Sequence, residues 1–317
     1  MKKTLLALAI AGAAVSAQAD VSISGHVNYS AGNLEDFNGN DGFDVQNNGA
    51  SGSRFRIVAS KEANGITYGT RQELGLTTGG TGALNTRVSQ FTIGGDFGQF
   101  SLGQGWEAGD DAAEQDKSGT YLLTGSAFDA WDVGNNFNNV DGGRDNRLRY
   151  DSPKLGGVAK IAADIDTNDN VGLSLALSGS NWSAGLFTEQ MDATGVADQI
   201  GGSVAANFGG FTAAVQLGET SGNGATSDTS YSGVILGYRV GKISVALDFA
   251  NYEVEPAAGG AATVDNGTTG LSFVYRPTGG VELYAGIRNA DSDIAGSTAF
   301  QGQDDATGVL VGGRVKF

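Results

Sequence analysis

Arginine recurs at alternate positions in two parts of this 317-residue chain, as Arg54 with Arg56 and as Arg147 with Arg149. Arg71 alternates with the acidic Glu73. In an extended strand, residues two apart point to the same face. Phe55 and Ile57 would then occupy the face opposite Arg54 and Arg56. Such rows of fixed cations do not catalyse reactions by themselves, but they can attract anions and orient dipoles that pass close to them.

Carboxylates are concentrated in a long segment that has few strand-forming residues, from about 105 to 145. Its acidic residues are Glu107, Asp110, Asp111, Glu114, Asp116, Asp129, Asp132 and Asp141. Lys117 and Arg144 are its only basic residues. Facing the arginines across a water-filled space, these acids would create a transverse field that selects ions and small polar solutes. Lying outside on a surface, the same segment would be an ordinary acidic loop.

Other site chemistries have weak support. His26 is the only histidine, and no nucleophile accompanies it, so we interpret it as a solvated residue on an inner wall. The chain has no cysteine, which excludes disulfides and thiolate metal sites. The Asp- and Asn-rich segment 36–48 could bind calcium, but ordinary loop structure fits its ligand spacing better. We predict no catalytic residue, no cofactor and no metal site.

The elements that would hold the arginines are β-strands. At the carboxyl end, Val309, Val311 and Val315 alternate with Arg314 and Lys316, and the chain stops at Phe317. Fifteen earlier segments show comparable alternation, which gives 16 candidate strands. They begin near residues 21, 54, 65, 86, 98, 146, 158, 171, 182, 200, 211, 234, 243, 271 and 281. High glycine (52) and low proline (3) suit many strands joined by tight turns.

Connections between these segments alternate between turns of a few residues and much longer polar loops. A soluble β-sandwich remains an alternative, but it gives no reason for that alternation. An arginine on a lipid-facing surface at mid-depth costs about 2–4 kcal/mol, which places the arginines toward a lumen. We therefore predict an all-β fold, a 16-stranded antiparallel transmembrane β-barrel with short periplasmic turns and long external loops. Arg87 has the parity of the outer face, and either a β-bulge that turns it inward or a position above the lipid would accommodate its charge.

The amino terminus indicates export. Lys2 and Lys3 precede an apolar run over 5–15, and Ala17-Gln18-Ala19 has the small residues of a cleavage site. We predict a cleavable signal peptide over residues 1–19 and a barrel domain over residues 20–317. The formal net charge is −16, which argues against a nucleic-acid partner and, with the acidic segment, favours a mild cation preference.

Several motifs resemble those of Gram-negative general diffusion porins, in the same order and spacing. They are 53–56 (SRFR) with Glu62, 91–98 (FTIGGDFG), 101–104 (SLGQ), and 149–153 (RYDSP) with Gly156 and Gly157. The resemblance covers the whole chain after the signal peptide. One departure is Gln104, where the family usually carries a basic residue, so the charge of that wall is open.

The resemblance implies a homotrimer in the outer membrane of a Gram-negative cell, in contact with outer-membrane lipid and lipopolysaccharide. It also implies that the third external loop folds inward and that Phe317 is read by the outer-membrane assembly machinery. The expected function is passive diffusion of ions and small hydrophilic solutes through a water-filled channel, without enzymatic activity. A substrate-specific channel and a non-conducting structural or adhesive barrel remain alternatives, which permeability would separate.

Overall fold

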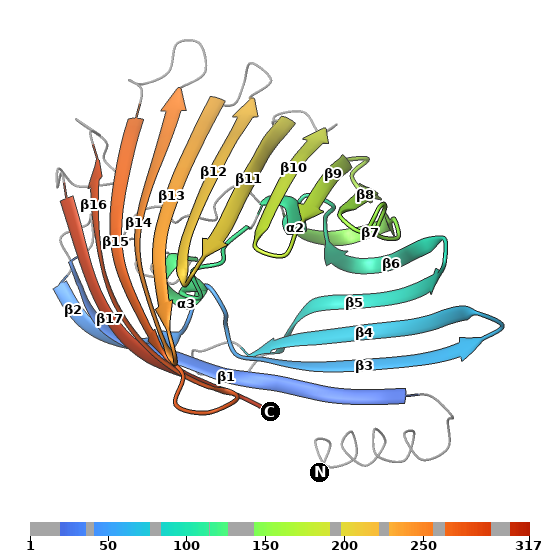
Figure 1. Ribbon diagram of the computed structural model, residues 1–317, viewed down its shortest axis with the longest axis horizontal. Helices are drawn as coiled ribbons and strands as arrows, with labels where there is room; N and C mark the ends of the chain where they lie inside the picture. The colour runs from blue at the N-terminus through green and yellow to red at the C-terminus, as the bar shows by residue number, and fades with distance from the viewer. Residues whose placement is uncertain are drawn as a thin grey trace.

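The chain forms one antiparallel β-sheet that closes on itself, as seen in the computed structural model in Figure 1. The structure describes residues 20–35, 41–76, 84–113, 115–125, 143–190, 198–221, 228–255, 264–292 and 305–317. Two four-residue helices, α2 (Asp110–Ala113) and α3 (Tyr121–Thr124), lie inside the barrel. Within the described ranges, no helix has the length and apolar character needed to cross a membrane.

Seventeen strands make up the sheet. They are β1 (Asp20–Glu35), β2 (Asp41–Asn47), β3 (Arg54–Ala63), β4 (Ile66–Leu76), β5 (Leu84–Gly95), β6 (Gly98–Trp106), β7 (Arg144–Asp151), β8 (Ala159–Asp166), β9 (Val171–Ser178), β10 (Trp182–Gln190), β11 (Asp198–Phe208), β12 (Phe211–Ser221), β13 (Asp228–Val240), β14 (Ile243–Glu255), β15 (Val264–Tyr275), β16 (Val281–Ser292) and β17 (Asp305–Lys316).

β1 closes the barrel, because it pairs with β17 on one side and with β2 and β3 on the other. Tyr29 pairs with Asn47 of β2, and His26 pairs with Arg54 of β3. The two strands therefore lie in line along one side of β1 and occupy a single strand position. The result is a closed antiparallel barrel of 16 strand positions, which confirms the predicted fold class.

β2 itself was not predicted, because segment 36–48 was interpreted as a loop. Within β2, Phe43 and Val45 are exposed to the outside, and the other residues are polar or glycine. This composition is typical of a loop, so the sequence pattern does not indicate a strand. The segment is a strand because its backbone pairs with β1. The six residues 48–53 between β2 and β3 face only two residues of β1, and Asn48, Ala50, Ser51 and Ser53 are buried. We call residues 48–53 the inward turn.

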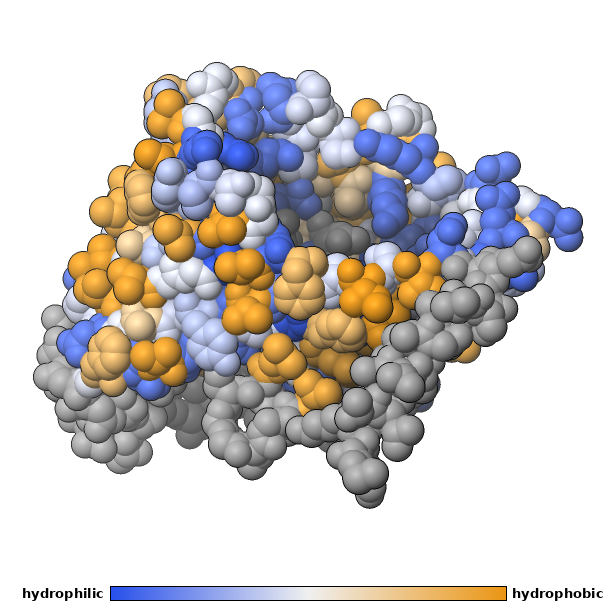
Figure 2. All heavy atoms as spheres, turned by 90° about the horizontal axis from the view of Figure 1, so that it is seen from below, coloured by the Kyte–Doolittle hydropathy of each residue, from blue (hydrophilic) through white to orange (hydrophobic). Residues whose placement is uncertain are grey.

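Side chains alternate between a crowded interior and an apolar exterior. In β10, Ser183, Phe187 and Glu189 are buried, whereas the Leu186 between them is 64% exposed. Apolar residues are exposed in the same way around the barrel, and Figure 2 shows many of them gathered on one face. A water-soluble monomer rarely exposes such a large apolar surface, so this exterior fits a lipid environment.

The carboxyl-terminal strand has the predicted faces. Val309, Val311 and Val315 are exposed outward, while Leu310 is fully buried inside. Phe317 continues the pairing, since its N–H donates to the Gly25 carbonyl (3.0 Å) and its carbonyl accepts from the Gly25 N–H (2.9 Å). Its ring lies so close to Gly25 that a Cβ there would meet it at 2.7 Å.

Two-residue turns join several strands at one end of the barrel. Between β3 and β4, Asn64 and Gly65 have φ of 53° and 76°. Between β11 and β12, Gly209 and Gly210 have φ of 57° and 93°. Positive φ at both central residues defines the turn that matches the twist of a hairpin, and it explains the Asn-Gly and Gly-Gly pairs.

Candidate channel constriction

The chain leaves β6 at Trp106 and enters the barrel interior instead of continuing outward. Ser203 Oγ of β11 donates a hydrogen bond to the Ala112 carbonyl (2.8 Å), and Gln216 Nε2 of β12 donates to the Ala113 carbonyl (2.8 Å). Gly185 of β10 leaves the space for this approach, because a Cβ there would lie 2.3 Å from the Ala112 oxygen. The described residues 107–113 and 115–125 thus form an inner loop. Glu114, Asp129, Asp132 and Asp141 lie outside the described residues.

The inner loop crosses to the opposite wall and is held there by α3. Arg276 donates to the Gly119 carbonyl, and α3 contacts β15 and β16. Leu122 and Leu123 are buried in an apolar cluster with Val274 and Tyr284. The four-residue α2 and α3 are too short to be stable alone, so these wall contacts determine where the loop lies.

Four arginines converge on one carboxylate on the inner faces of β3, β4 and β5. Glu73 is bound by Arg54 (3.2 Å), Arg56 (2.6 Å), Arg71 (3.0 Å) and Arg87 (3.1 Å). The Glu73 side chain is only 1% exposed, whereas those of Arg56 and Arg71 are 36% and 39% exposed. Three formal positive charges remain on this surface after Glu73 is counted. We call these five residues the arginine wall.

Arg87 joins this wall through a register shift. The pairing of β4 with β5 changes between Glu73 and Leu74. Glu73 pairs with Val88, and Leu74 pairs with Thr86, so Arg87 is an extra residue in β5. The shift lets Arg87 reach Glu73 inside the barrel. The predicted β-bulge is therefore present, and sequence parity alone gives the wrong face for this residue.

Arg147 and Arg149 also face inward, but they are buried and paired instead of lining open space. Arg147 pairs with Asp164 and lies 3.8 Å from the Glu107 carboxyl. Arg149 donates to both Asp151 oxygens (3.0 and 2.9 Å) and to the Glu107 carbonyl (2.6 Å). These two arginines fasten the start of the inner loop. Gln104 shares the outer face with Leu102, so the departure from the family pattern does not affect the inner wall.

The acids expected at the constriction differ in exposure. Glu107 is 4% exposed and lies against Glu189 and Asp164. Burial, with a hydrogen bond to the Glu189 carboxyl, raises the pKa of Glu107 far above its usual range. Burial also raises the pKa of Asp116, although the Ser118 N–H donates to its carboxylate at 2.7 Å. Glu107 therefore stays protonated at neutral pH. Nothing is described of the Asp111 side chain.

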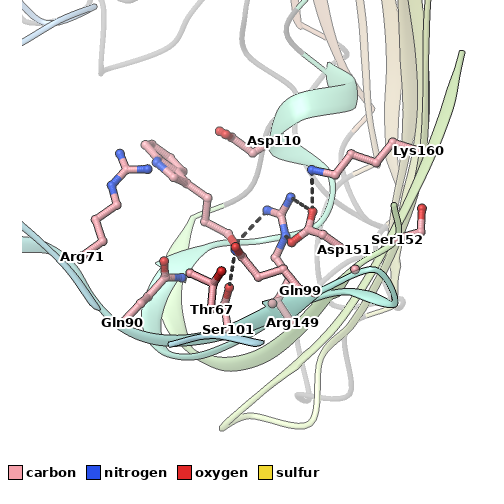
Figure 3. Close-up of a pocket in the computed structure, with 14 residues that line it drawn as sticks. Thr67, Arg71, Gln90, Gln99, Ser101, Asp110, Arg149, Asp151, Ser152 and Lys160 are labelled. Carbon is pink, nitrogen blue, oxygen red and sulfur yellow. Dashed lines mark hydrogen bonds and ion pairs between the residues drawn. The ribbon is translucent and has the colours of Figure 1, made fainter. Parts of the chain in front are cut away.

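Among the predicted loop acids whose side chains the structure describes, Asp110 lines an open space. A cavity of about 670 Å³ lies between α2 and the inner faces of β4 to β8. Figure 3 shows Arg71, Asp110 and Lys160 on different sides of it. Its polar lining includes Thr67, Arg71, Gln90, Gln99, Ser101, Asp110 and Lys160. Lys160 also pairs with Asp151 at 2.9 Å. Opposite charges thus face one another across a polar space inside the barrel.

The family model described as Gram-negative porin matches residues 4–295. This chain belongs to the Gram-negative porin family. It is therefore an outer-membrane β-barrel protein that forms a channel. No curated protein sequence matches this porin significantly.

Solved structures with the same fold include three from other bacteria. The anion-selective porin from Comamonas acidovorans has a TM-score of 0.77 and 20% identity, covering 95% of this chain and 100% of that one. The trimer form of in-vitro folded OmpT from Vibrio cholerae has a TM-score of 0.67 and 15% identity, covering 94% and 99%. The outer membrane channel DcaP of Acinetobacter baumannii has a TM-score of 0.63 and 14% identity, covering 95% and 98%.

Sequence reasoning missed Lys160, Trp106 and the role of His26 in this porin. Lys160 could have been found, because it alternates with Ala162 and Asp164 on the inner face of β8. Trp106 lines the cavity and lies 4.4 Å beneath the Arg144 guanidinium, a contact between distant residues. The interpretation of His26 as solvated was wrong in one respect. His26 Nε2 lies 3.0 Å from the Gly52 carbonyl and is half-buried by the inward turn.

Proposed function

We propose that this porin is a general diffusion channel for ions and small hydrophilic solutes. The observation that carries the proposal is the cavity between α2 and the arginine wall. Five strands and the inner loop contribute amides, hydroxyls and charges to its lining, and Trp106 is the one aromatic residue among them. A lining of dispersed polar groups stabilises many small hydrated solutes and has no dedicated apolar surface for a particular one.

The constriction acts through fixed charges of opposite sign. Arg71 and Lys160 lie on the strands, and Asp110 lies on the inner loop. Water and dipolar solutes align in the field between them, whereas apolar solutes disturb that order and pass less readily. We propose that Arg54, Arg56 and Arg71, with Arg87, form the charged wall of the constriction, and that Asp110 is its counter-charge. Arg147, Arg149, Glu107 and Asp116 position the loop.

The sign of ion preference follows from which charges lie near the constriction. Two unit charges 4 Å apart interact by about 4 kcal/mol at an effective dielectric constant of 20, and salt at about 0.1 M screens exposed charges beyond about 10 Å. Near charges therefore outweigh acidic residues at distant strand ends. The arginine wall carries three net positive charges, while Glu107 is protonated and burial raises the pKa of Asp116. We propose a mild anion preference. The name of the Comamonas porin agrees with this sign.

The experiment is the reversal potential of the purified porin in a planar bilayer under a KCl gradient. We expect stepwise openings and a potential that favours chloride. Arg56→Gln and Arg71→Gln, at the two most exposed members of the wall, should each shift the potential toward cations. A potential that favours potassium would contradict this sign and support the cation preference that the sequence predicts.

The same bilayer separates the alternative functions. A current or solute flux that saturates for one solute would favour a substrate-specific channel. Flux that falls smoothly with solute size would support general diffusion. Folded protein that never conducts would contradict the channel proposal and favour a structural or adhesive barrel.

We also propose that residues 1–19 are removed on export and that the barrel over residues 20–317 assembles as a homotrimer. The trimer form of the Vibrio OmpT structure supports the oligomer. The exposed Phe317 ring, directly after β17, is available to the assembly machinery. The apolar exterior of the barrel is available to contact lipid and lipopolysaccharide. Mass spectrometry of the outer-membrane protein would give the mature start, and cross-linking would give the number of subunits.

A further inference from the structure

The inward turn is a compact structure because its own asparagines close it. The Ser51 N–H donates to Asn48 Oδ1 (3.0 Å), and the Ser53 N–H donates to Asn47 Oδ1 (2.7 Å). Asparagine side chains that accept from a backbone N–H a few residues ahead stabilise turns of this kind. These two hydrogen bonds close the turn through residues near to one another in the sequence.

Strands on both sides of the turn fix it in the lumen. Asn28 of β1 donates to the Ser51 carbonyl (2.7 Å), and its backbone N–H donates to Ser53 Oγ (2.9 Å). Arg314 of β17 donates to Ser51 Oγ (2.8 Å), and His26 Nε2 approaches the Gly52 carbonyl. These contacts come from adjacent positions of the closed sheet, so the turn cannot move without breaking several hydrogen bonds.

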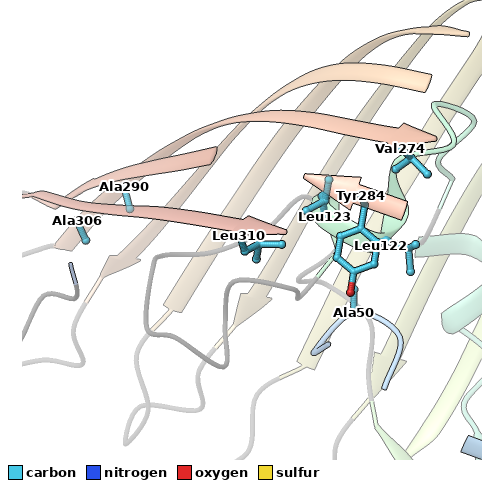
Figure 4. Packing of buried hydrophobic residues seen from close by; sticks show 8 residues of the cluster. All are labelled: Ala50, Leu122, Leu123, Val274, Tyr284, Ala290, Ala306 and Leu310. Atoms are coloured by element: carbon cyan, nitrogen blue, oxygen red, sulfur yellow. The ribbon is translucent and has the colours of Figure 1, made fainter. Parts of the chain in front are cut away.

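The inner loop rests on this turn. Asn48 Nδ2 donates to the Leu122 carbonyl of α3 (3.0 Å) and contacts the Tyr284 hydroxyl (3.2 Å). Ala50 packs with Leu122, Leu123 and Tyr284 in one apolar cluster, shown in Figure 4. The approach is close, because a Cβ on Gly125, directly after α3, would lie 2.9 Å from the Ala50 Cβ.

From this arrangement we propose that the inward turn is a clamp that holds α3 against the β15–β16 wall, with Asn48 as its positioning residue. The inference rests on the proposed diffusion function and specifies what sets the aperture. The strand wall anchors α2, whereas α3 is held by the β15–β16 wall and also by a second inward-folded segment of the chain. The width available to solutes then depends on all of these contacts, and Asn48 supplies the side-chain hydrogen bond from the inward turn to α3.

Asn48→Ala removes the donor to Leu122 and the acceptor for Ser51 while leaving the barrel strands unchanged. The lost hydrogen bond to Leu122 favours the released state several-fold, so the released population of α3 should rise roughly fivefold. Single-channel records should show more frequent excursions to a lower conductance, because an α3 that leaves the β15–β16 wall enters the lumen. In liposome swelling, uptake of a trisaccharide should decrease relative to that of a monosaccharide. Asn33→Ala, on the exposed face of β1, is the matched control and should behave as the wild type.

A cross-link provides the rescue that separates clamping from folding. The chain has no cysteine, so Ala50→Cys with Gly125→Cys introduces a single pair. The two Cβ atoms would lie 2.9 Å apart, and a modest outward shift would bring them to the roughly 3.5–4.5 Å found in disulfides. Gly125 has φ of −77°, which a cysteine can adopt. Oxidation in the Asn48→Ala background should restore wild-type noise and size dependence, and reduction should reverse this.

The outcomes distinguish the two proposals. A wild-type protein that folds but does not conduct contradicts the diffusion function. A conducting wild type, together with a folded Asn48→Ala variant of unchanged noise and size dependence, overturns the clamp alone. Oxidised cross-linked protein that keeps the Asn48→Ala excursions would also overturn it, because α3 would then not be the moving part.

Discussion

Replacing Glu73 with glutamine should destabilise the barrel strongly and raise its anion preference at the same time. Glu73 is the single carboxylate bound by Arg54, Arg56, Arg71 and Arg87, at 2.6–3.2 Å. Glutamine keeps the shape and one acceptor oxygen, but its amide N–H groups face guanidinium donors. The four cations are then left without a counter-charge.

The structure indicates the size of the effect. Breaking a buried ion pair by removing one partner costs about 3–5 kcal/mol. The side chains of Arg54 and Arg87 are 14% and 19% exposed, so the cost of leaving them unpaired is close to that for a buried ion pair. Arg56 and Arg71 are more than one-third exposed, and solvent screens most of their loss. We therefore expect Glu73→Gln to lower the free energy of unfolding by about 3 kcal/mol, near the lower end of that range.

Urea unfolding of the refolded protein in detergent micelles measures this change, followed by tryptophan fluorescence. Glu62→Gln, at the exposed end of β3, is the control and should change stability little. Adding Arg87→Gln to Glu73→Gln should recover part of the loss, because one uncompensated cation is removed. A loss below about 1 kcal/mol for Glu73→Gln, or no recovery in the double variant, would refute the view that one carboxylate holds the arginine wall together.

Three further predictions concern the inner loop. Asp110→Asn should shift the KCl reversal potential toward anions, whereas Glu107→Gln should leave it unchanged, because Glu107 is already protonated; equal shifts would contradict these roles. The contribution of Glu107 to stability should be full below the ordinary carboxyl pKa of about 4.3 and fall as pH rises toward the raised folded pKa of Glu107, because only the unfolded state releases the proton in that range. Urea midpoints across pH should follow this slope, and Glu107→Gln should flatten it; an equally steep slope in the variant would exclude Glu107 as its source. Gly185→Ala should displace α2, since its Cβ would lie 2.3 Å from the Ala112 oxygen, and an unchanged single-channel conductance would show that the loop adapts.

Much of the barrel could be predicted because membrane strands obey a local rule. Side chains must alternate between lipid and lumen, so β17 and the inward faces of Arg54 and Arg56 follow from neighbours in the sequence. The β-bulge at Arg87 is also indicated by the sequence, because Arg87 is a cation at a position with the outward parity of Phe91. The sequence does not indicate β2, because its few apolar residues lie among polar ones and its strand structure depends on pairing with β1.

The constriction was harder to predict because its chemistry depends on contacts between distant residues. Composition identifies Glu107 as an acid, but only the fold places it beside Glu189 and removes its charge. Arg149 is correctly assigned to the inner face. Its pairing with Asp151 and the loop backbone depends on where the inner loop lies. Charge counting along the chain therefore predicts a cation preference, whereas the described constriction retains positive charge.

The pairing of β1 with β17 has a consequence for how the barrel is made. His26 pairs with Lys316, and Gly25 with Phe317, so the first and last strands of the sheet meet at one seam. Bringing residues so far apart together costs more chain entropy than forming any hairpin, and it must come after β17 is available. Until then β1 and β16 are open edges that can pair with other chains. A chain that stops before β17 should aggregate even though all its hairpins can form.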